Sequence, residues 1–347
     1  MSARLQSLWY RPTPPPLALR PLSSLFDLAV RARRAAYARG WLHSTRLARP
    51  VIVVGNLTVG GSGKTPLVIW LVAQLRAAGF VPGVVLRGYG GNAARRQQSL
   101  LVEPDSDPAE VGDEALLLRR RTGGAVAVGR QRVQAARLLL EHGADVIVAD
   151  DGLQHLALAR DFELAVVDGD RGFGNGFLLP AGPLRERPER LASVDAVVIN
   201  GADGGWRGRS AAAGSTFTMR LQGERLQPVD GAAAELPLAS FAGRRVHAVA
   251  GIGNPRRFFA QLHAAGLELR EHAFPDHHRF RSGELDFGDA LPVLMTEKDA
   301  VKCRGLGIAR GWYLPVDACF EPTESAALIT RVRQAVVEAR NRSGSGD

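Results

Sequence analysis

The segment VIVVGNLTVGGSGKTPLVIWL, residues 51–71, constrains the fold of this chain more than any other. Its unbroken apolar run predicts a buried strand, and a helical apolar pattern begins at Lys64 after a glycine-rich bend. Against the pattern G-x-x-x-x-G-K-[ST], the chain matches at Gly63, Lys64 and Thr65, while Thr58 stands at the first glycine position. The purely structural alternative is a glycine-rich turn before a helix, but the order of strand, loop and helix favours a nucleotide-binding loop.

Such a loop binds phosphate because bare backbone amides converge at the N-terminus of the helix. Lys64 is expected to reach the β- and γ-phosphates, and the Thr65 hydroxyl is expected to coordinate Mg²⁺. The predicted nucleotide-binding residues are Thr58, Val59, Gly60, Gly61, Ser62, Gly63, Lys64 and Thr65.

The rest of the chain alternates short apolar runs with helical patterns, which predicts an α/β fold. The runs VIVV, VPGVVL, AVAV, DVIVAD, LAVVD and AVVIN are continuous in valine and isoleucine, as in strands buried on both faces of a parallel sheet. We predict a P-loop NTPase-like, doubly wound, mostly parallel sheet in a kinase domain at 50–214. A two-stranded linker is expected at 215–238, and a second, smaller α/β domain at 239–347.

Two adjacent acids, Asp150 and Asp151, end the apolar run of DVIVADDGLQH. In nucleotide-binding domains, acids at the carboxyl end of such a strand hold Mg²⁺. They could instead be turn or cap residues, but two adjacent carboxylates are costly without a nearby cation. We therefore predict that Thr65, Asp150 and Asp151 form the metal site.

Two other clusters carry acids and histidines. The stretch VGDEALLL places Asp113 and Glu114 at the start of a helix, where spacing alone favours an N-cap role. The stretch FPDHHRF contains Asp276, His277 and His278, and a histidine pair is more often structural than catalytic. A metal site would need further ligands at suitable spacing, and the sequence shows none.

Most of the positive charge lies in the first 49 residues. The whole chain carries +9, and residues 1–49 hold nine arginines against the single acid Asp27, which leaves about +1 for the remainder. Apolar residues recur among these arginines at roughly helical spacing: Leu22, Leu25, Phe26, Ala29, Val30, Tyr37 and Trp41. A basic amphipathic helix with aromatic ends is typical of a membrane interface. The alternative is a helix packed on its own domain with a solvated basic face.

Composition and motifs exclude several classes. With 46% hydrophobic and 23% charged residues the chain is globular, and its two cysteines lack C-x-x-C spacing, which fits a reducing cytosol. No apolar run is long enough for a transmembrane helix. A GTPase or metal-delivery protein would need N-K-x-D, but INGAD lacks the lysine, and Lys298 and Asp299 are adjacent in TEKDA. No DNA- or RNA-binding motif accompanies the basic arm, so we expect no nucleic-acid partner.

Taken together, the motifs VGNLTVGGSGKTP, LRGYGG, VGDEALLL, VIVADDGLQH, GFGNGFLLPAGPLRE, GIGNPRRFF, FPDHHRF and LMTEKDAVK resemble the tetraacyldisaccharide 4'-kinases, the lipid A 4'-kinases of Gram-negative bacteria. The resemblance covers about residues 51–302, in order. It implies an ATP- and Mg²⁺-dependent enzyme that phosphorylates the 4'-hydroxyl of a tetraacylated glucosamine disaccharide 1-phosphate. It also implies a peripheral protein at the cytoplasmic face of the inner membrane, whose basic arm at 1–49 contacts an anionic surface. We expect a monomer.

The resemblance also assigns roles to residues. Asp113 matches the family's catalytic aspartate and is paired with His277, which replaces the cap interpretation of Asp113. Lys64 and Asp151 join them as catalytic residues, and Asp150 lies with Asp151 near the metal. Glu186 of PLRE matches an acid of the active-site cleft. The family often has proline directly after that glutamate, whereas here Arg187 intervenes.

Overall fold

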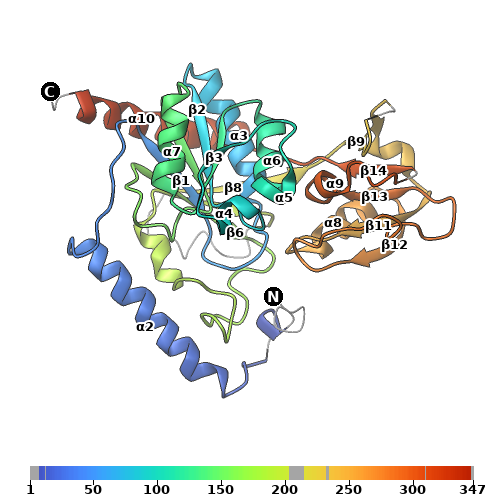
Figure 1. Ribbon diagram of the computed structural model, residues 1–347. Coiled ribbons are helices and arrows are strands. Elements are labelled where there is room, and N and C mark those ends of the chain that lie inside the picture. The colour runs from blue at the N-terminus through green and yellow to red at the C-terminus, as the bar shows by residue number, and fades with distance from the viewer. Residues whose placement is uncertain (1–7, 12, 203–214, 232–233, 309, 345–347) are drawn as a thin grey trace.

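The computed structural model describes residues 8–11, 13–202, 215–231, 234–308 and 310–344. They form two lobes, each built on one sheet, and a long helix, α2 (Leu19–Ala38), extends along the outside of the larger lobe (Figure 1). The strands of the larger lobe are β1 (Val51–Gly55), β2 (Pro82–Leu86), β3 (Leu100–Leu101), β4 (Val126–Val128), β5 (Val146–Asp150), β6 (Phe162–Asp168), β7 (Ala196–Asn200), β8 (Thr216–Gln222) and β15 (Asp317–Phe320). Its helices are α3 (Lys64–Ala77), α4 (Asn92–Arg95), α5 (Pro108–Val111), α6 (Asp113–Thr122), α7 (Arg132–Glu141), the 3₁₀ turn η1 (Pro188–Ser193) and α10 (Pro322–Gly344).

In the part of the chain that the structure describes, the large sheet has nine strands in the order β15-β8-β7-β6-β1-β5-β2-β4-β3. All neighbours from β8 to β4 pair in parallel, and only the two edge strands, β3 and β15, are antiparallel. The predicted doubly wound, mostly parallel sheet is thus confirmed. Because β1 lies between β5 and β6, the chain leaves it at the point where the strand order reverses, which is where open α/β sheets bind ligands.

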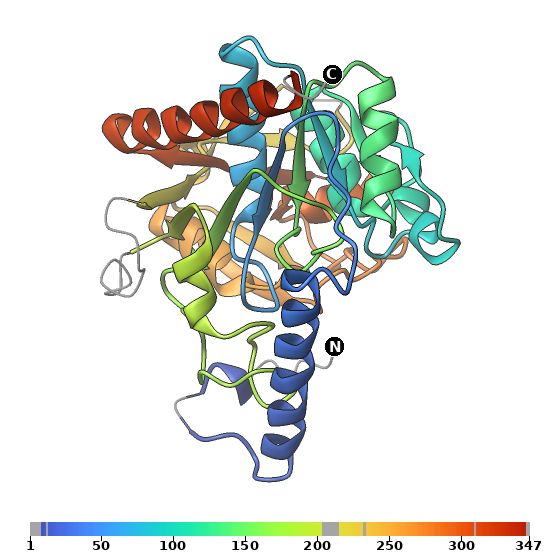
Figure 2. The same ribbon diagram turned by 90° about the vertical axis from the view of Figure 1, so that its left-hand side faces the viewer.

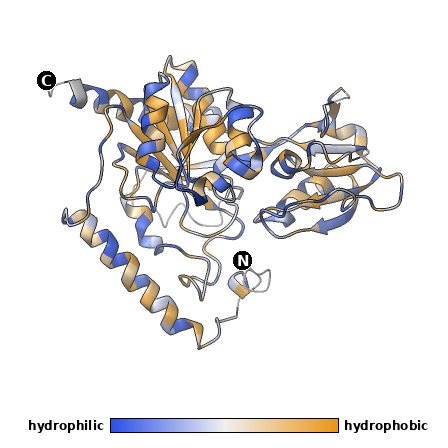
Figure 3. Cartoon of the chain, in the orientation of Figure 1, coloured by the Kyte–Doolittle hydropathy of each residue, from blue (hydrophilic) through white to orange (hydrophobic). Residues whose placement is uncertain are grey.

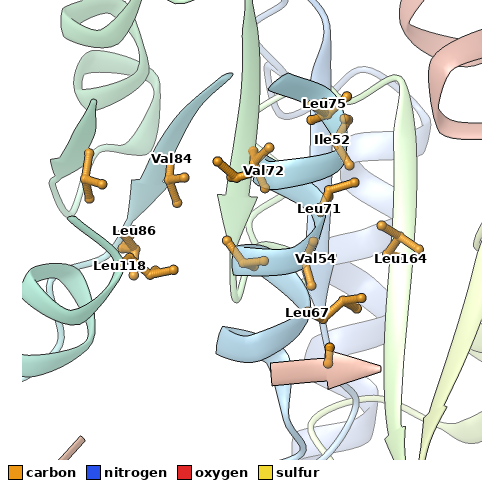
Figure 4. Packing of buried hydrophobic residues seen from close by; sticks show 14 of the residues in the cluster. Ile52, Val54, Leu67, Leu71, Val72, Leu75, Val84, Leu86, Leu118 and Leu164 are labelled. Carbon is orange, nitrogen blue, oxygen red and sulfur yellow. The ribbon is translucent and has the colours of Figure 1, made fainter. Parts of the chain in front are cut away.

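Alternation along β1 shows why the sheet is buried on both faces. Ile52 and Val54 belong to the core on the α3 side, and Val51 and Val53 belong to the core on the α7 side. On α3, Leu67, Leu71 and Leu75 recur every four residues, so they form one stripe against the strands (Figure 4). Burial on both faces explains the continuous valine and isoleucine runs in the sequence.

The smaller lobe contains a six-stranded sheet among the described residues, in the order β10-β9-β14-β13-β11-β12. Its strands are β9 (Arg225–Pro228), β10 (Leu236–Pro237), β11 (Arg245–Ala250), β12 (Glu268–Ala273), β13 (Val293–Thr296) and β14 (Gly311–Leu314). Its helices are the 3₁₀ turn η3 (Leu238–Phe241), α8 (Pro255–Ala264) and α9 (Glu297–Cys303). The helix α9 packs against α6 of the larger lobe, so the lobes touch directly.

The end of the chain differs from the expected domain division. Residues 317–344 do not stay in the smaller lobe, because β15 pairs with β8 and α10 buries Leu328, Val332 and Val336 in the core of the larger lobe (Figure 2). The expected linker differs too, since β8 and β9 belong to different sheets and do not pair with each other. The lobes are therefore joined by two chain crossings, one between β8 and β9 and one between β14 and β15.

The basic arm is attached to the larger lobe through polar side chains. Ser23 donates to the Leu178 carbonyl at 2.8 Å, and Asp27 accepts two hydrogen bonds from Arg187 at 2.8 and 2.6 Å. Three leucines of the same helix point away from the protein: Leu22, Leu25 and Leu28 are 52%, 63% and 60% exposed. Apolar and polar residues alternate along α2 (Figure 3). None of the described helices is long and apolar enough to cross a membrane.

Candidate active site

The glycine-rich loop follows β1 and is held by a residue that sequence reasoning missed. Gly63 has a φ of 92°, in the left-handed region, and a Cβ there would lie 2.3 Å from Nδ2 of Asn200. Asn200, at the end of β7, donates to the Ser62 carbonyl at 2.9 Å. Glycine is therefore required where the loop enters α3, because both its backbone conformation and the approach of Asn200 exclude a side chain.

Lys64 lies at the mouth of this loop. Its ammonium group donates to Oδ1 of Asn56 at 3.0 Å and forms an ion pair with Asp151 at 3.5 Å. An ammonium group has three donors, so one remains for a phosphate oxygen in this arrangement. The side chain is thus held in place by polar partners from two neighbouring strand ends.

Asp150 and Asp151 occupy different environments at the end of β5. Asp150 is 3% exposed, its Oδ1 has no hydrogen-bond partner in the described structure, and burial raises its pKa to about 7. Burial also opposes ionisation of Asp151, but Lys64 and Arg185 outweigh it and lower the pKa. Arg185 donates to both carboxylate oxygens of Asp151, at 2.8 and 2.9 Å. The unpaired buried oxygen makes Asp150 the better fit to a divalent cation.

No group of three or more His, Cys, Asp or Glu side chains among the described residues is arranged to hold a metal. Mg²⁺ does not require such a group, because it takes one or two protein oxygens and completes its shell with substrate phosphates and water. Asp150 and the hydroxyl of Thr65 both face the cleft, so they can supply those oxygens.

Asp113 and His277 come together from different lobes. Asp113 is the first residue of α6, is 6% exposed and accepts a hydrogen bond from the Glu114 amide at 3.1 Å. Nδ1 of His277 lies 3.3 Å from each of its carboxylate oxygens. The N-cap position belongs to Gly112, so Asp113 is the first residue of the helix and not its cap. The cap interpretation of Asp113 was therefore wrong, and the pairing implied by the resemblance is present.

The electrostatics of this pair keep Asp113 ionised. Burial opposes its charge, but the hydrogen bond with His277 and the charge of Lys298 lower its pKa well below the usual range. For His277, burial lowers the pKa, but the hydrogen bond with Asp113 and the charges of Asp113 and Asp276 together outweigh it, so the net shift is upward. His277 also has a φ of 61°, a conformation that a non-glycine residue adopts at a cost, which is common at functional sites.

A cleft of about 1210 Å³ between the lobes gathers most of the predicted site. Its lining includes the loop from Val59 to Thr65, Asp150 and Asp151 at the end of β5, and His277. Three predicted residues do not line it. Thr58 is buried in a backbone bridge to Leu184, Asp113 lies behind Gly112 and Glu114, and Glu186 lies outside the cleft.

Glu186 instead lies beneath the arm. It accepts hydrogen bonds from Arg34 of α2 at 2.7 Å and from Gln154 at 2.9 Å, and it lines a separate hollow of about 430 Å³. The expectation that Glu186 faces the cleft was wrong for this arrangement. Its neighbours Gln154 and Arg185 line both spaces, so the hollow adjoins the cleft.

The smaller lobe covers the phosphate loop. Arg171 donates to the Gly253 carbonyl at 2.8 Å and also to the Gly61 carbonyl. Asp168 accepts hydrogen bonds from Asn254 at 3.3 Å and from Arg257 at 2.6 Å. These contacts hold the GIGNP segment against the loop and close the cleft over it.

Comparison with known proteins connects this geometry to a family. A family model described as tetraacyldisaccharide-1-P 4'-kinase matches residues 16–335. A tetraacyldisaccharide 4'-kinase of Alkalilimnicola ehrlichii is 53% identical over 92% of this chain and 94% of its own length. One from Nitrosococcus oceani is 47% identical over 99% of both chains. The crystal structure of the "apo" form of LpxK from Aquifex aeolicus in complex with ATP aligns with a TM-score of 0.73 at 28% identity, covering 91% of this chain and 98% of that one.

Proposed function

The chain belongs to the tetraacyldisaccharide-1-P 4'-kinase family, and from that premise we propose how its residues perform the reaction. The protein is an ATP-dependent kinase that transfers the γ-phosphate to the 4'-hydroxyl of a tetraacylated glucosamine disaccharide 1-phosphate in lipid A biosynthesis. The contact that carries the mechanism is the pair formed by Asp113 and His277 across the lobes, with Nδ1 at 3.3 Å from the carboxylate.

ATP binds in the glycine-rich loop, with its terminal phosphates beside Lys64. Mg²⁺ would supply positive charge that offsets the charge developing on the transferred phosphoryl group. Asp150 and the Thr65 hydroxyl would hold it, since the Oδ1 of Asp150 is buried without a partner in the described structure. Asp151 neutralises Lys64 and Arg185 and thereby keeps both side chains oriented toward the cleft.

Asp113 accepts the proton of the acceptor hydroxyl. A sugar hydroxyl is a weak nucleophile that loses its proton as the new P–O bond forms, and a carboxylate within hydrogen-bond reach can take it. A loose phosphoryl-transfer transition state requires little base strength, so a carboxylate of lowered pKa is sufficient if it is well oriented. The hydrogen bond from His277 provides that orientation, and closure of the lobes excludes water that would hydrolyse ATP.

The enzyme acts at the cytoplasmic face of the bacterial inner membrane, as a peripheral monomer. Support comes from α2, on which Ser23 and Asp27 face the protein while Leu22, Leu25 and Leu28 are exposed. In water such an orientation exposes apolar surface, whereas in an interface the leucines enter the acyl layer and the arginines contact anionic headgroups. The substrate's acyl chains occupy the same layer, and no nucleic-acid partner is needed to explain the charge of the arm.

The variant Asp113→Asn tests the assignment of the base. It keeps the size of the side chain and an oxygen for His277 but removes the negative charge, so kcat should fall by about 10²-fold or more. The affinity for ATP should be nearly unchanged, because the phosphates bind at the loop before α3 and beside Lys64, whereas Asp113 lies at the start of α6. Phosphate transfer to the disaccharide lipid and binding of an ATP analogue are measured side by side. Loss of ATP affinity with normal kcat would show that Asp113 serves the nucleotide and not the acceptor.

A further inference from the structure

Lys298 lies at the junction of the two lobes and contacts the residues of the acid–histidine pair. It is the second residue of α9, and its ammonium group lies 2.9 Å from Oε1 of Glu114 on α6. The same nitrogen is 3.4 Å from Oδ1 of Asp276 and 3.4 Å from Nε2 of His277. In the sequence, Lys298 appeared in the motif LMTEKDAVK and in an incomplete guanine-binding pattern, without a role of its own, so its proximity to His277 is a finding of the structure.

The chemistry of this contact restricts where His277 can carry its proton. An ammonium group has donors and no acceptor, so its contact with Nε2 is favourable only when Nε2 is the unprotonated, accepting nitrogen. In the neutral ring the hydrogen then lies on Nδ1, which faces Asp113. Burial alone would lower the pKa of Lys298, but Glu114 and Asp113 raise it above its usual value, so the ammonium group stays charged.

We propose that Lys298 is a positioning residue that holds His277 in the Nδ1-protonated tautomer, so that Asp113 is the group that receives the hydroxyl proton. His277 then cannot be the base, because Nε2 is engaged by Lys298 and Nδ1 already donates to Asp113. This inference rests on the proposed role of the Asp113–His277 pair. It adds that the larger lobe contributes to the choice of tautomer, because Glu114 holds the ammonium group.

Several charged groups face the imidazole and determine what happens when Lys298 is removed. From α6 come Asp113 and Glu114, and beside the ring lies Asp276, 3.9 Å from Nε2. The ring of Tyr89 also lies against it, with 5.0 Å between ring centroids. With these acids left and the ammonium group gone, a proton on Nε2 is favoured, so His277 should become doubly protonated at a higher pH than in the unaltered protein.

The test is nitrogen NMR of the histidine rings in the full-length protein, with the His277 signals assigned through His277→Gln. In the unaltered protein, at a pH above the titration midpoint of His277, the hydrogen should lie on Nδ1. In Lys298→Met, Nε2 should carry a hydrogen, and the titration midpoint of His277 should rise by about one pH unit. We also expect kcat to fall by about tenfold, with the KM for ATP unchanged and the acidic limb of the kcat profile displaced to higher pH.

A matched control is Lys302→Met, one turn further along α9. Lys302 forms an ion pair with Asp299 at 2.7 Å and is not a hydrogen-bond partner of His277. The tautomer of His277 should therefore be unchanged in this variant, although a positive charge has been removed from the same helix. If both lysine variants change the His277 ring equally, the effect is one of general charge and the proposal fails.

A second variant and a measurement without substrate distinguish the inference from a folding defect and from a failure of the proposed reaction. If Lys298→Met melts early because Glu114 is left unpaired, the double variant Lys298→Met/Glu114→Gln removes both charges and should show the same change in tautomer. A hydrogen on Nε2 of the unaltered protein above the titration midpoint of His277 would overturn the proposal. So would a His277 ring that is unchanged in Lys298→Met and in the double variant. Because the ring is observed without substrate, this result is independent of whether Asp113→Asn loses activity.

Discussion

Replacement of Gly253 by alanine tests whether the contact between the phosphate loop and the smaller lobe belongs to the working enzyme. A Cβ on Gly253 would lie 2.4 Å from the amide nitrogen of Gly61 and 3.1 Å from two backbone carbons of Gly60. These are backbone atoms, so they cannot rotate away as a flexible side chain would. Ordinary contact begins near 3.4 Å, so the two segments must separate by about 1 Å.

That separation can be converted into an expected rate. A misplacement of about 1 Å far from the reacting atoms costs roughly 10²-fold in rate, which corresponds to about 2.7 kcal/mol of activation free energy. The loss should appear in kcat, because moving the smaller lobe shifts His277 away from Asp113, whereas Lys64 and the loop remain in the larger lobe. Turnover and the KM for ATP are measured at saturating lipid substrate. A variant that folds normally and keeps kcat within twofold would refute the reasoning, since the lobes would then not need this contact.

Three further predictions concern the nucleotide, the metal and the membrane. Lys64→Ala should lower kcat by about 10²-fold or more at saturating ATP, while a thermal melt should show that the protein is still folded. Near-normal turnover in this variant would show that the loop takes no part in the mechanism. Burial raises the pKa of Asp150 to about 7, and a metal ligand must be deprotonated. The affinity for Mg²⁺ should therefore be constant above about pH 7 and should decrease by about tenfold for each pH unit below it. Titrations of Mg²⁺ at several pH values check this, and the same slope in Asp150→Asn would contradict it. The double variant Leu22→Gln/Leu25→Gln should lose about 1 kcal/mol of vesicle binding per leucine at high salt, while the matched change Val337→Gln on α10 should lose none.

The features that the sequence predicted well are those encoded by neighbouring residues. The strand, loop and helix around Lys64 follow one another in the chain, and the alternation of β1 between two cores produces its unbroken apolar run. The path of the last residues was not predictable in this way. Leu328, Val332 and Val336 mark one buried face of a helix, but that spacing is the same whichever core the helix covers. Only the pairing of β15 with β8 decides that α10 returns to the larger lobe.

For the arm, the sequence left open two alternatives, a helix in a membrane interface and a helix packed on its own domain, and the structure has features that fit each. The helix is packed on its own domain, as the alternative interpretation required. The packed side holds Ser23 and Asp27 as well as Phe26, yet Leu22, Leu25 and Leu28 are exposed. Periodicity in the sequence predicted an amphipathic helix but could not tell which face meets the protein. That choice depends on Arg187 and on the Leu178 carbonyl, which lie more than a hundred residues further along the chain.

The chemistry of the site depends still more on contacts between distant segments. Asp113 and His277 are separated by 164 positions and Glu114 and Lys298 by 184, so no local pattern could pair them. All four residues meet where α6 packs against α9, which means that one interface builds both the acid–histidine pair and the ion pair behind it. An opening of the lobes would therefore separate His277 from Asp113 and Lys298 from Glu114 together. The base would then lose its orienting partner at the moment when water gains access to the cleft, so the same motion that admits water disables the group that could activate it.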